Sequence, residues 1–490
     1  MRPGKANTTA AKGLVEAALR GELTEEQARR LYRLGAEAVT LALMAASKHI
    51  AEQDKRLNEQ DTVIAGLQGQ REASQPSPST PSGMVPIYTK PNTRKRRKKP
   101  GAKKGHPGHR RQKPKRIDDR QTHRLKRCPC CGGPLQRCDR KRTRTIEDIP
   151  EEIEPVVTEH TIWRDYCPKC KKHVEPVVPD ALPRATIGHH LIALTAWLHY
   201  GLGVTIDQII DILSYHLQTK LTPGGLIHAW QRLAEILLVW YEQIAEESRN
   251  SAYLHADETG WRVNGQGCWL WCFTNDRNCY YIIEYCRGSP VVQKFFTEAF
   301  DGVLITDFWA AYDSVDAADR QKCLAHLLRE LEKVDLHNDS AEWQAFAKKL
   351  RRLLRDGIRL RKRPDFAPGK FQTRVDRLNA RLAELAAKEY VDPDARRLAK
   401  RLRKYAESIF TFLDYSYVTA DNNFGERQIR PAVILRKSSQ SNRSDRGAAT
   451  QAVLMSVYRT LRLRGLNPTQ TIADALKTYL TTGKLPPLPQ

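Results

Sequence analysis

The sequence predicts a multidomain α+β protein, and three observations lead to that class. At 490 residues the chain is long enough for several domains, each with its own core. Apolar residues recur with helical spacing in residues 12–70, 185–250 and 340–412. Four short apolar runs between residues 252 and 306 are separated by turn signals or a short helical stretch, as strands are. We therefore expect one sheet with helical regions before and after it.

The composition indicates a polyanionic partner. The chain carries 81 Lys and Arg against 56 Asp and Glu, a formal net charge of +25. Such an excess bears on partners and solubility rather than on the fold. Nucleic acid is the favoured partner. An acidic membrane surface is the weaker alternative, because no basic amphipathic helix has a bulky aromatic face, and no run of 18 apolar residues predicts a membrane span.

The N-terminal helical region carries a heptad pattern. Leu43, Ile50, Leu57 and Ile64 recur every seventh residue, with weaker Ala and Gln positions between them. One interpretation is a short coiled coil through which the protein self-associates. The other is a single amphipathic helix packed on its own domain, and so few heptads leave both open.

A linker and a basic block follow. Residues 73–93 are rich in Pro and Ser, which predicts an extended, disordered linker. Residues 94–116 then hold 13 Lys and Arg and no acid. Such a block repels itself until it meets phosphates, so we favour DNA contact over a solvated linker. Its candidate DNA-binding residues are Arg94, Lys95, Arg96, Arg97, Lys98, Lys99, Lys103, Lys104, Arg110 and Arg111.

Two C-x-x-C pairs predict a structural zinc site. Cys128 and Cys131 form the first pair, and Cys167 and Cys170 the second. A two-residue spacer lets both thiolates of a turn reach one tetrahedral Zn²⁺, and two turns complete a Cys₄ site. The segment between them is strand-like, so we expect a zinc ribbon with a long hairpin. Cys130 is a further cysteine that could substitute as a ligand. The odd total of 11 cysteines, without a signal peptide, indicates a reducing compartment rather than a disulfide framework.

A helix pair is expected next. Thr222 and Pro223 have the residue types of an N-cap and a first helical position. With a preceding helix at about 205–217 they form a helix-turn-helix-like pair. Such a pair can read DNA, although most helix pairs only pack a core.

From residue 251 the period changes to that of strands. Runs at 252–257, 269–274 and 280–285 predict three antiparallel strands joined by polar turns. A helix at about 291–300 and a fourth strand at 303–306 follow. This is the order of a ribonuclease-H-like α/β core.

Three acids are the catalytic candidates. Asp257 ends the first strand, Asp307 lies just past the fourth, and Glu426 opens a basic helical stretch far downstream. Three convergent carboxylates can hold two divalent cations, which activate a water and clamp a phosphoryl group. Glu258 and Asp313 are neighbours that we treat as support or surface, since Glu258 on a strand points away from the face of Asp257.

Several residues near these acids are candidates for supporting roles. His255 shares the strand face of Asp257. On a helix, Cys323 and His326 share one face. A role beside the metals or towards DNA and a packed polar pair are equally open for them. Arg427, Arg430, Arg436 and Lys437 follow Glu426 and are candidate DNA contacts, with ordinary helix surface as the alternative.

The stretch between Asp307 and Glu426 is too long for one loop. It holds three repeats of helical apolar spacing whose other faces are rich in Arg and Lys, which predicts a helical insertion. The expected domains are 1–72 (helical), 73–116 (linker and basic block), 117–180 (zinc ribbon), 181–250 (helical, DNA-binding), 251–335 (core, first part), 336–415 (insertion), 416–464 (core, second part) and 465–490 (tail).

Taken together, these motifs resemble the DDE transposases of the insertion-sequence-66 group over nearly the whole chain, most loosely at residues 1–70. The residues that carry the resemblance are Asp421-Asn422-Asn423, Glu426-Arg427, Arg430-Pro431, His255-Ala256-Asp257-Glu258-Thr259-Gly260-Trp261, Thr306-Asp307, Ala311-Tyr312-Asp313, Cys323, His326, Cys128-Pro129, Cys131-Gly132, Gly105-His106-Pro107-Gly108-His109 and Ser444-Asp445-Arg446-Gly447. The stretch between Lys437 and Asp445 departs from the aromatic or apolar residues that members often carry there.

The resemblance implies a DNA transposase with Asp257, Asp307 and Glu426 as catalytic residues and Mg²⁺ or Mn²⁺ at the site. It implies binding to element ends and target DNA, an oligomer on DNA, accessory proteins from the same element, and a bacterial cytoplasmic location. A transposon-derived DNA-binding regulator without catalysis is the alternative, and a structure-specific nuclease a weaker one.

Overall fold

The computed structural model describes residues 14, 24–73, 114, 116–136, 142–150, 153–362 and 368–490. The chain divides into two compact units, Met1–Thr80 and Pro81–Gln490, and each is described by itself. Nearly all of the expected linker and basic block, including every candidate DNA-binding residue from Arg94 to Arg111, lies outside the described residues.

The first unit is helical, as predicted. Helix α2 (Glu25–Arg33) begins at a capping box in which Thr24 and Gln27 exchange hydrogen bonds. Helix α3 (Ala36–Ala73) follows. The heptad residues Leu43 and Ile50 are exposed in the single chain, at 66% and 58%. The coiled coil therefore stays a prediction.

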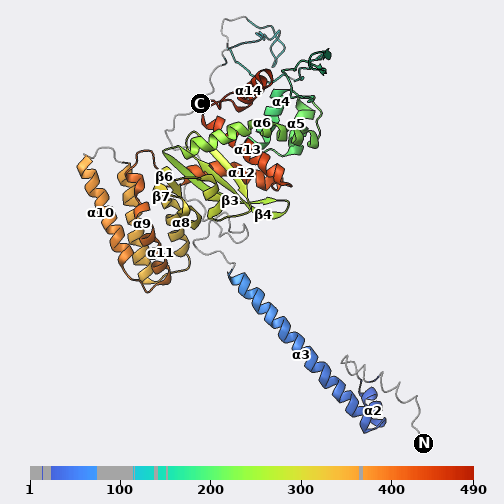
Figure 1. The fold of residues 1–490 in the computed structure, drawn as a ribbon, viewed down its shortest axis with the longest axis vertical. Coiled ribbons are helices and arrows are strands. Elements are labelled where there is room, and N and C mark those ends of the chain that lie inside the picture. Colours follow the sequence, from blue (N-terminus) through green and yellow to red (C-terminus); the bar gives the residue numbers. More distant parts are fainter. Residues whose placement is uncertain are drawn as a thin grey trace. The chain divides into compact units, whose positions relative to one another are not determined.

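The second unit contains one mixed sheet in the order β5-β4-β3-β6-β7 (Figure 1). β5, β4 and β3 are antiparallel neighbours, and β3, β6 and β7 run parallel. The strands are β3 (Tyr253–Val263), β4 (Gln266–Thr274), β5 (Cys279–Glu284), β6 (Phe300–Thr306) and β7 (Ala317–Lys322). The four strands expected from the sequence are present, and β7 was not foreseen.

Helices cover both faces of this sheet. α12 (Asn423–Ser439) and α13 (Asp445–Leu463) pack on one face with α6 (Pro223–Arg249). α7 (Ser289–Phe295) and the 3₁₀ turn η3 (Ala310–Ser314) pack on the other. Side chains alternate between the two faces along β3. Trp261 therefore packs in the core with α6 and α13, whereas Leu254 and Ala256 pack in the core with α7 and η3. The mixed α/β class is thus confirmed.

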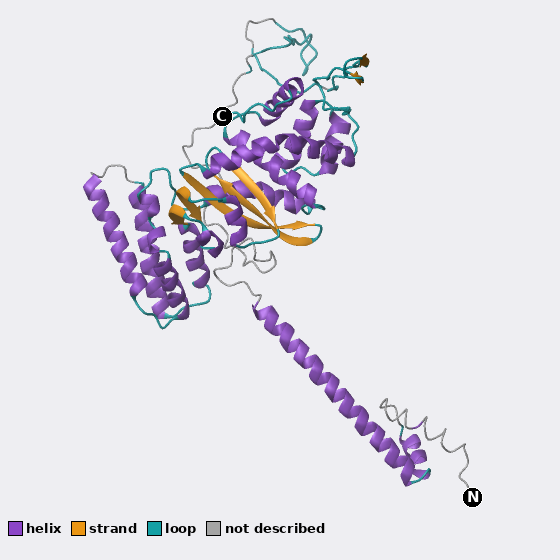
Figure 2. Ribbon diagram, viewed as in Figure 1, coloured by secondary structure: helices purple, strands orange, loops and turns teal. Residues whose placement is uncertain are grey.

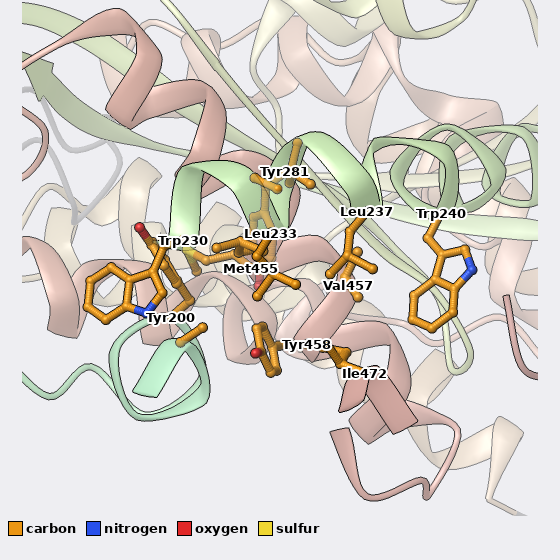
Figure 3. Packing of buried hydrophobic residues seen from close by; sticks show 14 of the residues in the cluster. Tyr200, Trp230, Leu233, Leu237, Trp240, Tyr281, Met455, Val457, Tyr458 and Ile472 are labelled. Atoms are coloured by element: carbon orange, nitrogen blue, oxygen red, sulfur yellow. The ribbon is translucent and has the colours of Figure 1, made fainter. Parts of the chain in front are cut away.

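The helical region before the sheet forms the largest core. α4 (His189–Ala196), a π-helical turn η2 (Trp197–Gly201), α5 (Ile206–His216) and α6 pack together, with Thr222 and Pro223 at the start of α6 as expected. Leu233 and Leu237 of α6 lie near Met455 and Val457 of α13, Trp230 packs on Tyr200 of η2, and α14 (Pro468–Thr482) adds Ile472 to the cluster (Figure 3).

The helical insertion is also present. α8 (Leu324–Val334) leads into three helices that lie side by side: α9 (Ala341–Arg361), α10 (Pro368–Ala387) and α11 (Pro393–Lys404) (Figure 2). The third apolar repeat was expected to continue as helix to Phe412. The helix instead ends at Lys404, and the short 3₁₀ turns η4 (Ala406–Ser408) and η5 (Thr411–Leu413) carry the remaining apolar residues into the core.

Candidate active site

Asp257 and Asp307 lie at the same level on two neighbouring parallel strands. β3 and β6 pair in a register that sets His255 beside Ile305. Continuing this register by two residues brings Asp257 level with Asp307, which directly follows β6. The sheet topology therefore brings together two acids that are far apart in the sequence.

The buried residue Asn422 fastens the start of α12, and with it Glu426, to β3. Its Nδ2 donates to the carbonyl oxygen of Ala256 at 2.8 Å, and its Oδ1 lies 2.8 Å from Nδ1 of His255. Its backbone N–H donates to Sγ of Cys323 at 3.1 Å. His255 and Cys323 therefore help to hold the start of α12 in place through their hydrogen bonds with Asn422. The sequence marks Asn422 only as part of a motif, because its complete burial is set by tertiary packing.

Gly425 lets α12 approach the sheet closely. A Cβ atom at this position would lie 2.8 Å from Oδ1 of Asn422 and 3.2 Å from Cβ of His255. Any larger residue would push the first turn of α12 away from β3 and move Glu426 with it. The glycine in the Asn423-Phe424-Gly425-Glu426 string is thus a steric requirement of the site.

The three predicted acids converge electrostatically. Burial raises the pKa of Asp257 well above its usual value of 3.8, and the negative charges of Glu258, Asp307 and Glu426 raise it further. These interactions require that the four carboxylates lie close together. A bound cation would relieve the repulsion that helps to raise the pKa of Asp257.

Glu258 belongs to this cluster, so the expectation that it is support or surface is corrected in part. It does face away from Asp257, but its side chain is only 2% exposed. Arg287 donates to its Oε1 at 2.8 Å, and the Tyr312 hydroxyl donates to its other oxygen. Burial and the charge of Asp307 raise the pKa of Glu258 to about 7, although both hydrogen bonds oppose this rise. Strand alternation predicted the face of β3 on which Glu258 lies, but not that Arg287 and Tyr312 bond to it there.

Arg287 connects Glu258 to the loop that carries Asp307. Its guanidinium lies 4.4 Å from the ring centre of Trp269 and 3.8 Å from that of Trp309. The backbone N–H of Trp309 donates to Oδ1 of Asp307 at 2.8 Å. The side chain of Asp307 is therefore oriented by a turn that stacks on Arg287. Nothing in the sequence marked these aromatic residues for such a role.

His326 and Arg329 of α8 both face Glu426. Nη2 of Arg329 lies 2.7 Å from Oε1 of Glu426, and Nε2 of His326 lies 3.5 Å from the same oxygen. Burial and the nearby Arg329 charge lower the pKa of His326, so its ring is neutral near pH 7. His326 therefore lies beside Glu426, and its supporting role stays a prediction. Arg329 was not anticipated.

A buried lysine supports Asp307 from behind. Lys322, at the end of β7, is fully buried and donates to Oγ1 of Thr306 and to the carbonyl oxygen of Asp307, each at 3.0 Å. Its Nζ also lies 3.5 Å from Asp313. Asp313 in turn accepts hydrogen bonds from Lys404 and Tyr405 at the end of α11. Asp313 therefore has the supporting role expected of it, because it links Lys322 of the sheet to the end of α11 in the insertion.

The basic residues after Glu426 divide into two groups. Arg427, Arg430 and Lys437 are exposed on α12 and remain candidate DNA contacts. Arg436 instead points inward, where it donates to Oγ1 of Thr259 at 3.2 Å and to the carbonyl oxygen of Gly260. Burial lowers the pKa of Arg436. Its geometry is that of a brace between α12 and β3.

Each C-x-x-C pair forms a compact turn. In the first, the Gly132 N–H donates to the Cys128 carbonyl, and Gly132 has a left-handed φ of 70°. In the second, the Cys170 N–H donates to Sγ of Cys167 at 3.5 Å, between β1 (Asp165–Cys167) and β2 (Lys172–Val174). Backbone N–H groups lower the pKa of Cys128 and of Cys167, which suits thiolate ligands.

The long hairpin expected between these turns is wrong for the described part of that segment. Residues 153–164 are not in strands, and Val156, Val157 and Trp163 are 96%, 88% and 76% exposed. A strand needs a hydrogen-bonded partner, and only the three-residue strands β1 and β2 pair here. Apolar, β-branched composition alone did not decide the structure.

Zinc content tests the two turns directly. We expect purified protein to carry about one Zn²⁺ per chain, and Cys128→Ser or Cys167→Ser to lose it, because three thiolates hold zinc far less tightly than four. Elemental analysis of the full chain measures this. Cys286→Ser, an exposed cysteine distant in sequence from both turns, is the matched control and should keep the metal. Retention of zinc by both turn variants would contradict the Cys₄ assignment.

The donor sets suit metals in their chemistry rather than in a preformed geometry. Among the described residues, no group of three or more His, Cys, Asp or Glu side chains is arranged as a metal site. Asp257, Asp307 and Glu426 nevertheless offer hard oxygen ligands, which Mg²⁺ and Mn²⁺ prefer. Nδ1 of His326 is buried beside them without a hydrogen-bond partner in the described structure. Both metal expectations therefore remain predictions.

No helix in the described ranges is long and apolar enough to cross a membrane.

Comparisons with known proteins cover the sheet and all three acids. Residues 184–450, more than half of the chain, match the family model described as "Transposase IS66 family". The uncharacterized protein y4jD of Sinorhizobium fredii (strain NBRC 101917 / NGR234) is 22% identical over 407 residues, 72% of this chain and 75% of that protein. The uncharacterized protein y4qI of the same strain is 27% identical over 286 residues, 52% of this chain and 51% of that protein.

Proposed function

Because the chain belongs to the IS66 transposase family, we propose that it is a DNA transposase that cuts and joins phosphodiester bonds at Asp257, Asp307 and Glu426. The observation that carries this proposal is the proximity of these acids, which come from three distant segments: besides burial, the charges of Asp307 and Glu426 raise the pKa of Asp257. The strand order β5-β4-β3-β6-β7 supports a ribonuclease-H-like core around them. A protein that only bound DNA would gain nothing from buried carboxylates facing a polyanion.

In this mechanism Asp257, Asp307 and Glu426 hold two Mg²⁺ or Mn²⁺ ions. When bound, such a pair supplies an activated water and charge stabilisation for in-line displacement. Asp307 is oriented by the N–H of Trp309, and Lys322 holds its backbone. Glu426 is held by Arg329, whose charge would also stabilise a nearby phosphate.

The same site would act twice. Hydrolysis at an element end leaves a 3′-hydroxyl, and that hydroxyl then attacks a phosphodiester of target DNA, with the 3′-oxygen of the target as leaving group. Neither step needs a covalent enzyme intermediate. We propose that the two C-x-x-C turns, the basic block and the helices of residues 181–250 hold the element ends. Two ends must be held together, so we also propose an oligomer, formed through α3, and leave room for accessory proteins of the same element.

A nicking and joining assay tests the proposal. Labelled element-end DNA is incubated with the full chain in Mg²⁺, and wild type is compared with Glu426→Gln. We expect the variant to lose cleavage and joining by at least about a thousandfold, as several kcal/mol of transition-state stabilisation are removed. The matched control is Glu332→Gln, an exposed acid on α8, which should leave both reactions unchanged.

Two outcomes would count against this function. Wild type that binds the ends but never cuts in Mg²⁺ or Mn²⁺, even with accessory proteins added, would favour the DNA-binding regulator. Cleavage without any joining would favour a structure-specific nuclease.

A further inference from the structure

The excess positive charge of the chain is confined to two segments. The basic block at 94–116 has 13 Lys and Arg and no acid. The insertion helices at 341–404 have 20 Lys and Arg and 8 Asp and Glu. Outside these two segments the chain has 48 basic and 48 acidic residues, so it is neutral there. The proposed function uses the first segment, but it leaves the charge of the insertion unexplained.

Five basic residues of α9 and its C-cap form one stripe. They follow each other at steps of four, three, four and three residues, which keeps them on one helical face. That face is opposite the one that buries Trp343, Leu350 and Leu354. The stripe spans about 21 Å along the helix axis. Its members, all exposed, are Lys348, Arg352, Arg355, Arg359 and Lys362.

A second stripe on α10 lies beside the first. Its members, all exposed, are Lys370, Arg374, Arg377 and Arg381. The two helices are joined at Asp356 of α9, which lies 2.9 Å from Arg381 of the second stripe and 3.9 Å from Arg359 of the first. The two stripes therefore form one basic surface, which we call the insertion face.

The arrangement of ion pairs separates this face from ordinary charged surface. Several basic residues that point towards the rest of the unit have acid partners: Arg397 and Arg401 pair with the buried Glu330, and Lys404 pairs with Asp313. On the outer side of α9, by contrast, Lys348, Arg352 and Arg355 have no ion-pair partner within the described residues. A solvated helix usually alternates charges and pairs them. The like charges on this face repel each other, and a bound polyanion would reduce that repulsion.

We infer that the insertion face binds the phosphate backbone of duplex DNA. The contacts would be made by Lys and Arg to phosphates, so they would fix orientation and carry no sequence information. α8 gives this contact a connection to the acids: Arg329 pairs with Glu426, and the adjacent Glu330 pairs with α11. The inference takes only the identity of the polyanion from the proposed function, and its test does not require cleavage.

The salt dependence of binding tests this inference. Binding of the full chain to a labelled duplex of arbitrary sequence is measured without added Mg²⁺ or Mn²⁺ at several salt concentrations. Lys348→Gln, Arg355→Gln and Lys362→Gln are combined in one variant. Each lost phosphate contact lowers the slope of log K against log salt by about 0.9, so we expect a loss of about 2.7. Affinity near physiological salt should fall at least about tenfold.

The control removes the same number and types of charge elsewhere. Arg277→Gln, Lys477→Gln and Lys484→Gln are exposed positions outside the insertion and outside the proposed DNA-binding regions. This variant should keep the wild-type slope. Single substitutions in the stripe, each expected to change the slope by about 0.9, keep the test valid if the triple variant unfolds. Equal slopes for stripe and control variants would overturn the inference while leaving the nicking assay unaffected. Weakened binding to polyglutamate with an unchanged DNA slope would overturn it in favour of an acidic protein.

Discussion

The Asp257→Asn variant is expected to lose DNA cleavage and also to melt at a higher temperature than the wild type near pH 7. Cleavage should fall at least about a thousandfold, because a metal ligand is lost. Stability should rise because Asp257 is partly buried beside three other carboxylates, and burial and then their charges raise its pKa well above 3.8. An amide of the same shape carries no charge to desolvate. A gain in stability with a loss of activity is expected where like charges in a functional site repel each other.

The gain in stability of Asp257→Asn over the wild type should increase as pH rises. The pKa of Asp257 is higher in the folded than in the unfolded chain, so the folded state resists losing the proton. Stability from this group is therefore lost as pH rises from about 3.8 through the folded pKa. Glu258 acts in the same direction, between its usual value of 4.5 and about 7. The difference in melting temperature between Asp257→Asn and wild type should be small near pH 4 and largest near neutral pH.

Thermal melts of the full chain at pH 4 and pH 7.5 measure this difference. One kcal/mol of stability corresponds to roughly 1 °C in a unit of this length, and the variant should melt above the wild type at pH 7.5. Asp316→Asn, an exposed acid of the same sheet region, is the control and should change neither melting nor cleavage. Mg²⁺ should raise the melting temperature of wild type more than that of Asp257→Asn. A variant that melts lower than wild type at pH 7.5 would contradict the electrostatic account.

The sequence predicted those elements whose periodicity reflects burial on one side. β3 to β6 alternate or run apolar between turn signals, and the first two repeats of the insertion have clean helical spacing. β7 (Ala-Ala-Asp-Arg-Gln-Lys) gave no such signal, because its buried Gln321 and Lys322 are satisfied by specific hydrogen bonds rather than by apolar packing. α13 was also missed. It is buried on nearly all sides, so it lacks the amphipathic pattern that marks a surface helix.

For the site, the sequence supplied the acids but not their surroundings. Asp257, Asp307 and Glu426 were recognisable from strand ends, spacing and resemblance. Arg329, Arg287 and the role of Asn422 depend on contacts between residues far apart in the chain, for which local patterns carry no signal. Tertiary packing therefore determines which neighbours orient an acid, whereas local sequence indicates only where an acid can be.

The Glu330→Gln variant is expected to destabilise the second unit strongly. Glu330 lies on α8 and is only 7% exposed, and its two oxygens accept hydrogen bonds from Arg397 and Arg401 of α11. Removing its charge leaves the partly buried guanidinium of Arg401 without this anion and leaves Arg397 with Asp394 alone. Breaking a buried pair costs about 3–5 kcal/mol. Because the two arginines are partly exposed to water, at 33% and 18%, we expect a smaller cost, about 2 kcal/mol.

The consequences of Glu330→Gln should extend to the acids, which separates it from a purely local lesion. The neighbouring Arg329 pairs with Glu426, and His326 lies on the same helix, so a loosened α8 would leave Glu426 less well held. We expect a lower melting temperature together with reduced cleavage at temperatures where the variant is still folded. Glu332→Gln, two residues along on the exposed side of α8, removes the same charge and should do neither. If the two variants melted and cleaved alike, the link between α8 and α11 would not stabilise the site, and the insertion would have to be held by its apolar contacts alone.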